Sequence, residues 1–519
     1  ILKAAALYLL LLLTGFVLNA LDTWILQKMG QEIIYQMREE VFTHIHSLSL
    51  NFFNNTPVGK LVTRVSNDTE AVNELFSTIL VKLFKNIVKI IGYAVVMLSI
   101  NVKMALVSFA LLPLVTVLTF FFRFMSRKAY ELTRNRITDL NTFLSEHLSG
   151  MKLIQIFARE EEKYAQFEKK SEDLYKANWR EVMTFAIFRP SIYLVSVLAM
   201  MLVIGTGSAG VLNQTLSLGT LFIFITYISS FFDPIQELAE QFGTLQSSLA
   251  SAGKIFSILD EKPDIVKPTH PVEVNIKGRI EFRHVWFAYE KDDYILKDIS
   301  FVIEPGEKCA FVGATGAGKS SILNLIGRYF DIQKGEILID GVNIKDIDTD
   351  VLRAAIGQVQ QDVFIFTGDI KNNISLDNEN ISIEDVRRAA EIVHADSFIE
   401  KMPGGYDAPV TERGSTLSAG QRQLLSFART LAYDPTILVL DEATANIDTE
   451  TEALITSALA KLMEGRTTIM VAHRLSTIQH ADKIIVMHQG QIEEAGTHQE
   501  LLAQNGLYRK LYDLQLVEA

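Results

Sequence analysis

The stretch Gly313-Ala-Thr-Gly-Ala-Gly-Lys-Ser320 decides the fold of the C-terminal half of the chain. It matches the pattern G-x-x-x-x-G-K-S/T, in which glycines let backbone N–H groups turn inward around phosphate oxygens at the start of a helix. The pattern needs a strand before it and a helix after it, and the apolar run Ala310–Val312 and the helical pattern Ser321–Tyr329 supply both. We therefore predict a nucleotide-binding loop in which Lys319 reaches the β- and γ-phosphates and the Ser320 hydroxyl binds Mg²⁺.

A second apolar strand, Ile437–Leu440, ends in the acid pair Asp441-Glu442. An acid at the carboxyl end of a parallel strand is placed for a metal beside the phosphate-binding loop. We predict that Asp441 holds Mg²⁺ through water and that Glu442 orients and polarises the attacking water as a general base. From Ile280 onward, short β-type runs alternate with helical patterns, which is typical of an α/β domain.

The composition of the 519 residues excludes several classes of protein. With 61 Asp+Glu against 49 Lys+Arg the net charge is −12, and no long basic stripe exists to neutralise the phosphates of a nucleic acid. The one cysteine, Cys309, rules out an intrachain disulfide and a cysteine-based metal cluster, and its apolar neighbours predict a small buried strand residue. The mean hydropathy of +0.20 is high for a soluble chain, and the apolar excess lies in the first half.

That first half contains candidate membrane-spanning helices, which need about 20 mostly apolar residues each. Five segments qualify, namely Ile1–Leu26, Leu83–Ile100, Met104–Phe122, Ile187–Gly207 and Leu218–Phe232. The long stretches between them, Gln27–Lys82 and Arg123–Phe185, belong in the cytoplasm because the second is rich in Lys and Arg. The short turns around Asn101–Lys103 and Ser208–Ser217 are then the outer turns. Because five crossings would then begin on the outer side, we expect a preceding helix and a natural total of six.

Some residues in the spans leave two interpretations open. Lys82, Lys85 and Lys89 share one helix face, and Lys89 lies about 18 Å below the outer turn, where it either faces a cavity or reaches toward the inner headgroups. The phenylalanines either line a pocket for flat apolar compounds or pack helices together. Three prolines in residues 263–271 mark an extended linker. We therefore divide the chain into an all-α transmembrane domain (1–258), a linker (259–279) and an α/β nucleotide-binding domain (280–519).

The order of the motifs resembles the ATP-binding cassette of ABC transporters over the whole of Ile280–Leu516. The motifs in that order are Tyr289, Gly313–Ser320, Gln361, Leu417-Ser-Ala-Gly-Gln421, Asp441-Glu442, Asp448 and His473. The stretch Glu412–Gln423 looks like the X-loop and signature of ABC exporters, and Phe52–Lys60 is similar to their first intracellular loop. The resemblance implies an exporter half-transporter of the type IV, multidrug kind, with ATP and Mg²⁺ as cofactors.

The resemblance also implies residue roles. Tyr289 stacks on adenine, Gln361 lies between Mg²⁺, water and the membrane domain, and His473 contacts the γ-phosphate and supports Glu442. The catalytic set is Glu442, His473 and Gln361; the metal set is Ser320, Gln361 and Asp441; the nucleotide contacts are Tyr289, Gly313, Thr315, Gly316, Ala317, Gly318, Lys319, Ser320 and Ser321. Ser418, Ala419, Gly420 and Gln421 grip the ATP of the opposite subunit, and Asp448 crosses the same interface. Coupling helices are expected near Asn51–Lys60 and Ala158–Lys163.

The signature departs from the family pattern, because Ala419 stands where glycine is usual and disfavours a positive φ. The catalytic set is nevertheless complete. The chain therefore looks like the D-type subunit of heterodimeric bacterial multidrug exporters of the BmrCD and LmrCD kind, with a partner that has a regular signature and a degenerate catalytic Glu. A homodimer is the alternative.

We expect ATP-driven export of small amphipathic compounds across the cytoplasmic membrane, with a multi-pass chain in the bilayer, the ATPase domain in the cytoplasm and no nucleic-acid partner. A lipid or lipopeptide flippase is an alternative, because it would use the same membrane helices and the same ATPase domain. A cassette protein that regulates a channel is a further alternative, which the intact Glu442 and His473 disfavour. The substrate itself is not specified by the sequence.

Overall fold

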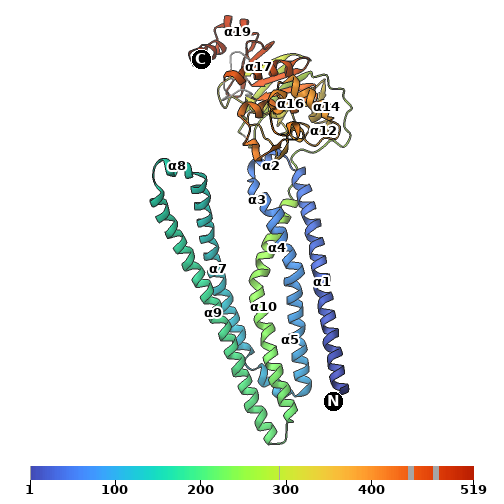
Figure 1. Cartoon of the computed structure of the whole chain (residues 1–519), viewed down its shortest axis with the longest axis vertical. Coiled ribbons are helices and arrows are strands. Elements are labelled where there is room, and N and C mark those ends of the chain that lie inside the picture. The colour runs from blue at the N-terminus through green and yellow to red at the C-terminus, as the bar shows by residue number, and fades with distance from the viewer. Residues whose placement is uncertain (1, 291–292, 442–448, 472–477, 519) are drawn as a thin grey trace. The chain divides into compact units, whose positions relative to one another are not determined.

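The computed structural model describes residues 2–290, 293–441, 449–471 and 478–518 (Figure 1). By their internal contacts these residues form two compact units. Unit 1 comprises Ile1–Ser47 and Thr56–Glu261, and unit 2 comprises Leu48–Asn55 and Lys262–Ala519. Each unit is described by itself.

Unit 1 consists of helices. They are α1 (Leu2–Ser47), α3 (Val58–Thr63), α4 (Thr69–Glu74), α5 (Leu80–Ile100), α6 (Val102–Phe109), α7 (Leu112–Ser149), α8 (Met151–Ile156), α9 (Glu160–Leu212) and α10 (Leu218–Leu259). Two π-helical turns, η1 (Arg64–Asp68) and η2 (Leu75–Ile79), join α3, α4 and α5 into one helical stretch. Helices α7 and α9 run side by side, while α10 packs on α4, α5 and α9 (Figure 1).

Five helical stretches of the described residues are long and apolar enough to cross a membrane, which confirms the five predicted spans. They are Ala5–Ser47, Val58–Ile100, Val102–Ser149, Glu160–Leu212 and Leu218–Leu259. In the first stretch, none of the most apolar window is buried within the chain. In the last stretch, a third of that window is buried. Most of their apolar side chains thus remain for contact with lipid or with another subunit, as expected where burial inside one chain is not the driving force.

The turns between the helices follow local side-chain chemistry. Asn101 adopts an extended conformation and its side chain accepts a hydrogen bond from the Met104 amide (3.0 Å), so α5 ends and α6 begins at the predicted outer turn. The second outer turn is shorter than predicted, because α9 continues to Leu212.

The second predicted coupling helix was misplaced. The sequence indicated Ala158–Lys163, whereas the short helix of this loop is α8, and Ala158 has a positive φ of 48°. Gly150 ends α7 early and Arg159 is the N-cap residue of α9, so the expected segment is divided between a turn and the following helix.

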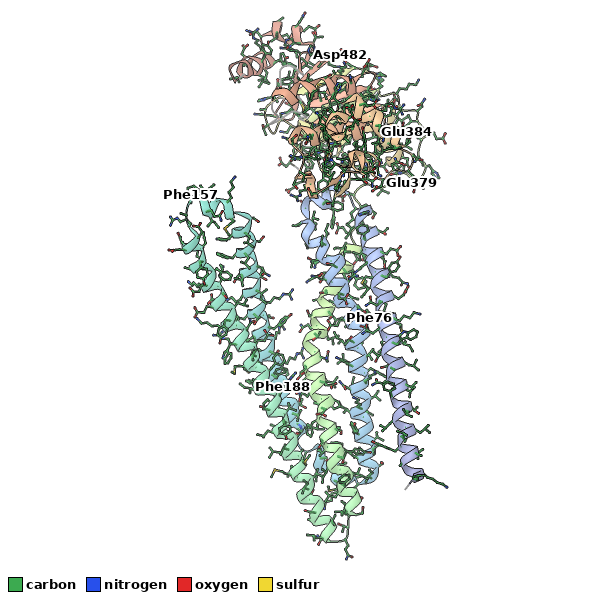
Figure 2. The ribbon with its side chains drawn as sticks, in the orientation of Figure 1. Phe76, Phe157, Phe188, Glu379, Glu384 and Asp482 are labelled. Carbon is green, nitrogen blue, oxygen red and sulfur yellow. The ribbon has the colours of Figure 1, made fainter. Side chains whose placement is uncertain are left out.

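Aromatic side chains form the core of unit 1. Phe122 of α7 stacks on Phe188 of α9 with ring centroids 3.8 Å apart and meets Phe185 edge-on at 5.3 Å. Phe188, labelled in Figure 2, and Phe232 of α10 belong to the same buried cluster. For these phenylalanines the structure favours the helix-packing interpretation, while others, such as Phe120, remain exposed.

Polar side chains on α5 make specific contacts in unit 1. Lys85 pairs with Asp22 of α1, and the buried Asn86 donates a hydrogen bond to Glu237 of α10 (2.8 Å). Lys89 is exposed within this chain. The two interpretations of Lys89 therefore stay open.

The described residues of unit 2 form three sheets. Its strands are β1 (Ile280–Phe287), β2 (Leu296–Ile303), β3 (Lys308–Val312), β4 (Lys334–Ile339), β5 (Val342–Asn343), β6 (Ile356–Val359), β7 (Gly368–Asp369), β8 (Pro409–Val410), β9 (Ile437–Asp441), β10 (Thr467–Val471), β11 (Lys483–His488) and β12 (Gln491–Gly496). The main sheet has the order β12-β11-β3-β10-β9-β6 and is parallel except at β12, and an antiparallel sheet has the order β2-β1-β4-β5. Strands β7 and β8 form a small pair.

The helices of unit 2 connect and cover these sheets. They are α2 (Leu50–Asn55), α11 (Lys319–Ile326), α12 (Thr349–Ala354), α13 (Ile370–Ser375), α14 (Ile383–Ile392), α15 (Asp396–Ile399), α16 (Ala419–Ala432), α17 (Thr449–Met463), α19 (His498–Gln504) and α20 (Leu507–Glu518). Short 3₁₀ turns lie at Gly405–Asp407 and Glu412–Gly414. Helices thus pack around a mostly parallel sheet, which confirms the predicted α/β class.

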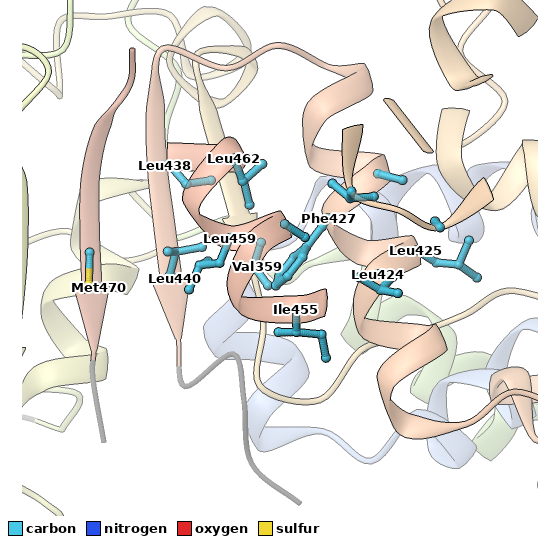
Figure 3. Close-up of a cluster of buried hydrophobic side chains, with 14 of the residues drawn as sticks. Val359, Leu424, Leu425, Phe427, Leu438, Leu440, Ile455, Leu459, Leu462 and Met470 are labelled. Carbon is cyan, nitrogen blue, oxygen red and sulfur yellow. The ribbon is translucent and has the colours of Figure 1, made fainter. Parts of the chain in front are cut away.

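Both faces of the main sheet are buried, with alternate residues on opposite faces. Leu438 and Leu440 of β9 pack with Phe427 of α16 in one core (Figure 3), whereas Ile437 and Val439 belong to the core between the two large sheets. The apolar run that predicted β9 therefore fits a strand covered on both sides.

Residues 260–279 of the linker have no regular secondary structure, and from Lys262 onward the linker belongs to unit 2. The Val272 amide donates to the carbonyl of Asp346 (2.8 Å), and Lys267 pairs with Asp350 (2.5 Å). The Asp340 carboxylate accepts hydrogen bonds from the amides of Lys277 (2.7 Å), Gly278 and Arg279 (both 3.1 Å). The linker is thus extended, as predicted, but bound to the core.

Candidate functional site

The strand register brings three of the predicted motifs to one edge of the main sheet. Val471 of β10 is level with Phe311 of β3 on one side and with Asp441 of β9 on the other. Because these strands are parallel, the chain leaves all of them at the same edge. The phosphate-binding loop after β3 and the carboxylate of Asp441 therefore share this edge, and Gln361 follows the neighbouring strand β6 by two residues.

The loop between β3 and α11 has the backbone that a phosphate cradle requires. Gly318 is the N-cap residue of α11 with a φ of 100°, and a Cβ there would lie 2.6 Å from Leu296 Cδ2. A Cβ on Gly313 would lie 2.3 Å from the carbonyl oxygen of Met487. Neither position tolerates a larger residue without displacement of its neighbours.

Lys319 is buried and its side chain crosses the loop. Its ammonium donates hydrogen bonds to the carbonyl oxygens of Gly313 (2.7 Å) and Ala314 (3.0 Å). A charge held across a loop whose amides precede a helix N-terminus is arranged for an anion. Ser320 is exposed beside it, and Ser321 is buried.

Tyr289 lies close to α11. Its hydroxyl donates to Ser321 Oγ (3.3 Å) and accepts from Asn324 Nδ2 (3.3 Å). Its ring meets Phe330 edge-on with centroids 4.9 Å apart. Asn324 and Phe330 were not singled out from the sequence, because neither belongs to a motif and both meet Tyr289 only through the fold.

The signature segment begins α16. Ser418 and Gln421 form a capping box, in which the Gln421 amide donates to Ser418 Oγ (3.1 Å) and the Ser418 amide donates to Gln421 Oε1 (2.9 Å). Ala419 is the first residue of this helix and does not have a positive φ. The expectation that alanine would conflict with a positive φ here was wrong, because the helical backbone accepts any residue except proline beyond its first turn.

Three predicted site residues lie outside the described residues, namely Glu442, Asp448 and His473. Asp441, which precedes Glu442, is half-buried at the end of β9. The structure thus describes the phosphate-binding loop, Tyr289, Gln361, Asp441 and the signature.

Cys309 of β3 is fully buried, as predicted, and burial raises the pKa of its thiol to about 12. The thiol therefore remains protonated and unreactive within β3.

Comparison with known proteins identifies the family. A family described as "ABC transporter transmembrane region" matches residues 1–235, and one described as "ABC transporter" matches residues 296–445. A Bacillus subtilis protein named "Probable multidrug resistance ABC transporter ATP-binding/permease protein YheH" is 40% identical over 495 residues, which cover 95% of this chain and 73% of the relative. The chain belongs to the ABC transporter family. This transporter is also 38% identical over 492 residues to the "ATP-dependent lipid A-core flippase" of Desulfotalea psychrophila, with 95% of this chain and 86% of the flippase covered.

A solved structure extends the likeness to the whole architecture. The structure of a bacterial Atm1-family ABC exporter with ATP bound matches with a TM-score of 0.83 and 28% identity, covering 96% of this chain and 88% of the exporter chain. The transporter therefore has the ABC exporter fold, with membrane helices followed by a cytoplasmic ATPase domain, and it couples ATP hydrolysis to transport. ABC exporters function as dimers in the lipid bilayer.

The described residues fit ATP and Mg²⁺. The glycine backbone leaves room that a Cβ would fill, and Lys319 and the start of α11 supply positive charge for phosphates. In the part of the chain that the structure describes, no three His, Cys, Asp or Glu side chains gather as a metal site. A phosphate-bound Mg²⁺ does not need such a cluster, because it takes one or two protein oxygens together with phosphate oxygens and water.

Proposed function

We propose that this chain is one half of a heterodimeric exporter that moves small amphipathic compounds out of the cytoplasm at the expense of ATP. The observation that carries the proposal is that one chain joins five apolar helices to an ATPase unit in which the phosphate-binding loop, Asp441 and Gln361 share one sheet edge. The similarity to a relative named for multidrug resistance supports the substrate class. In this proposal residues 1–258 form the transmembrane domain, 259–279 the linker and 280–519 the ATPase domain.

In the proposed ATP site, Tyr289 stacks on adenine and the loop Gly313–Ser321 holds the phosphates. Ser320, Gln361 and Asp441 hold Mg²⁺, directly or through water. Glu442 takes a proton from the attacking water, and His473 contacts the γ-phosphate and orients Glu442. When bound, Mg²⁺ neutralises charge that develops on the phosphate oxygens.

The signature of each subunit closes on the ATP of the other in this proposal. Ser418, Ala419, Gly420 and Gln421 form the N-terminus of α16, which favours the negative charge of a phosphate. Binding of two ATP molecules draws the cassettes together through contacts to both faces, and hydrolysis releases them. Asp448 lies at the same proposed interface.

The proposal of a heterodimer rests on the contrast between a complete catalytic set and an altered signature in the same chain. The catalytic set of this chain is complete, whereas its signature carries Ala419, whose methyl group occupies the helix end that must approach a phosphate. We infer a partner with a regular signature and a degenerate catalytic Glu. A homodimer is the alternative, and the helical φ of Ala419 makes it more acceptable than the sequence suggested.

A lipid or lipopeptide flippase is the second candidate function. The relative of Desulfotalea psychrophila named as a lipid A-core flippase favours it at 38% identity. The relatives named as a multidrug resistance transporter and as a lipid flippase do not support the other alternative from the sequence, a regulatory cassette protein without transport.

The test is ATP turnover of the complex in proteoliposomes against a panel of amphipathic dyes and phospholipids, with Glu442→Gln as the key variant. Loss of a general base should lower turnover by roughly 10²- to 10⁴-fold. Glu464→Gln, an exposed carboxylate outside the site, is the matched control and should keep wild-type turnover. Normal turnover of Glu442→Gln would overturn the assignment of the active base, and full activity of this chain purified alone would overturn the heterodimer.

A further inference from the structure

The chain passes between its two units three times, after Ser47, after Asn55 and after Glu261. Residues close to the first crossing are hydrogen-bonded to residues close to the third, once in unit 1 and once in unit 2. In unit 1, His44 Nε2 lies 3.0 Å from the carbonyl oxygen of Glu261, which can only accept a hydrogen bond. In unit 2, Ser49 Oγ (2.9 Å) and Asn51 Nδ2 (3.0 Å) both donate to Asp264 Oδ2.

Asp264 therefore ties the start of the linker to the residues that precede and begin α2. Ser49 follows the end of α1 by two residues, and Asp264 follows the end of α10 by five. One carboxylate oxygen that accepts two donors fixes both chain segments at once. A displacement of the linker at Asp264 must thus pass into Ser49 and Asn51, and from there along the chain into α1.

Arg328 fixes the linker two residues further on. It is buried, follows α11 by two residues and has a φ of 46°. Its guanidinium donates from Nη2 to the carbonyl of Val266 (3.2 Å), from Nη1 to the carbonyl of Lys345 (3.3 Å) and from Nε to Asp331 Oδ1 (3.2 Å). A buried guanidinium needs these partners, so movement of the loop after α11 draws the Val266 backbone with it.

The same loop reaches the nucleotide site. Phe330, two residues after Arg328, packs against the ring of Tyr289, and α11 itself begins at the phosphate-binding Lys319. Tyr289 and Lys319 are thus connected to Arg328 through Phe330 and α11, and Arg328 is hydrogen-bonded to Val266, which follows Asp264 by two residues.

We propose that Arg328 and Asp264 are positioning residues that transmit the nucleotide state of the ATPase unit through the linker to α1 and α10 of the same chain. The hydrogen bonds of this route lie within one chain, at the start of α2 and along the linker, so the route needs no contact with the opposite subunit. It rests on the proposed function, since it presupposes an ATP-driven conformational cycle. Arg328 and Asp264 touch neither substrate nor nucleotide in this proposal.

Hydrogen–deuterium exchange of the complete transporter in nanodiscs tests the route, with the nucleotide-free state compared with the ATP–vanadate-trapped state. We expect trapping to change exchange in residues 27–47 of α1 in the wild type. Asp264→Ala should bind and trap 8-azido-ATP as the wild type does but lose most of that change, on the scale of about fivefold or more in exchange rate. Asp264→Asn is the matched control, because its amide oxygen still accepts both hydrogen bonds, and it should behave as the wild type.

Ser49→Ala combined with Asn51→Ala removes the two donors instead of the acceptor and should give the same loss, with no additional effect of Asp264→Ala in the triple variant. Arg328→Lys keeps the positive charge but replaces the three donor nitrogens, which reach three different acceptors, with one. It should reduce the change in hydrogen exchange of α1 while nucleotide trapping persists. A wild-type response of α1 in Asp264→Ala, or in the donor variant, would overturn the inference alone. Failure of the wild type to trap nucleotide would overturn the proposed function and the inference with it.

Discussion

At the scale of single residues, Gly318 combines a positive φ with a close approach of a neighbouring side chain in the candidate ATP site. Gly318→Ala would combine a φ of 100° with a Cβ 2.6 Å from Leu296 Cδ2, so we expect a loss of roughly 1–3 kcal/mol in stability and a displaced start of α11. ATP affinity, measured with a fluorescent nucleotide, should fall at least about tenfold, since the amides of that start form the cradle.

Gly306→Ala is the control for Gly318→Ala. Gly306 also has a positive φ (78°), but a Cβ there meets no heavy atom within 4 Å. It should lose about 1–2 kcal/mol of stability from backbone strain alone and keep its ATP affinity. Equal ATP affinities for the two variants would contradict the requirement for Gly318 in the cradle.

Cys309 gives a prediction about pH. Burial raises the pKa of its thiol to about 12, whereas an exposed thiol in the unfolded chain titrates near about 8.5. The unfolded state therefore loses this proton first, and the contribution of the thiol to stability is complete below about pH 8.5 and declines as the pH rises toward the pKa of the folded state. Maleimide labelling of the Cys309 peptide, followed by mass spectrometry, should be slow at pH 8 in the native transporter and fast in denaturant. Fast native labelling would contradict the buried position.

Single residues also show how far sequence reasoning reaches. The glycines and Lys319 could be predicted because a short local pattern fixes their conformation and their distance from the phosphates. The contacts of Tyr289 with Asn324 and Phe330 could not, since three separate segments have to fold before these side chains meet. The absence of a positive φ at Ala419 could not be predicted, because the pattern does not reveal that a helix begins at that residue.

At the scale of elements, two helices with the same kind of N-terminal capping box allow an effect on stability to be distinguished from an effect on function. Ser418 of α16 and Ser382 of α14 both form capping boxes, with the N3 amide 3.1 Å from the serine oxygen in each. Loss of either hydroxyl should cost about 1 kcal/mol of stability. Ser418→Ala should in addition lower ATP turnover, because its hydroxyl is proposed to bind the ATP of the partner, whereas Ser382→Ala should not. Thermal unfolding and turnover of the two variants check this, and equal turnover would contradict the role of Ser418.

The elements themselves were predicted with uneven success, for physical reasons. Long apolar runs and the apolar strand Ile437–Leu440 carry a strong signal, so the five spans and the sheet core were predicted correctly. The position of α8 was not, because a helix of six residues has little periodicity and its start depends on where Gly150 ends α7. The polar extensions of the spans proved to be continuous with them, as in α9.

At the scale of the whole molecule, the hydrogen bonds that hold the linker within unit 2 had no signal in the sequence. Ser49 and Asp264 are 215 residues apart, and the stretch that contains Asp264 shows only a proline-rich linker. A hydrogen bond of this kind depends on the complete fold. The membrane half, the linker and the ATPase half could be recognised from composition, but the way in which the linker is bound to Asp340, Asp346 and Arg328 could not.

Unequal ATP sites give the prediction that belongs to the assembled transporter. If Glu442 acts on ATP gripped by a regular signature of the partner, while Ala419 faces a site without a catalytic Glu, only one of the two sites turns over rapidly. Vanadate should then trap about one nucleotide per dimer. Lys319→Ala should lower turnover by roughly 10²-fold or more, because it removes the fixed positive charge that binds the phosphates in the active site. The corresponding lysine change in the partner should leave much of the turnover, since that site serves mainly to close the dimer. Two trapped nucleotides per dimer, or equal losses from the two lysine changes, would show that the sites are equivalent and that Ala419 is tolerated in a symmetric transporter.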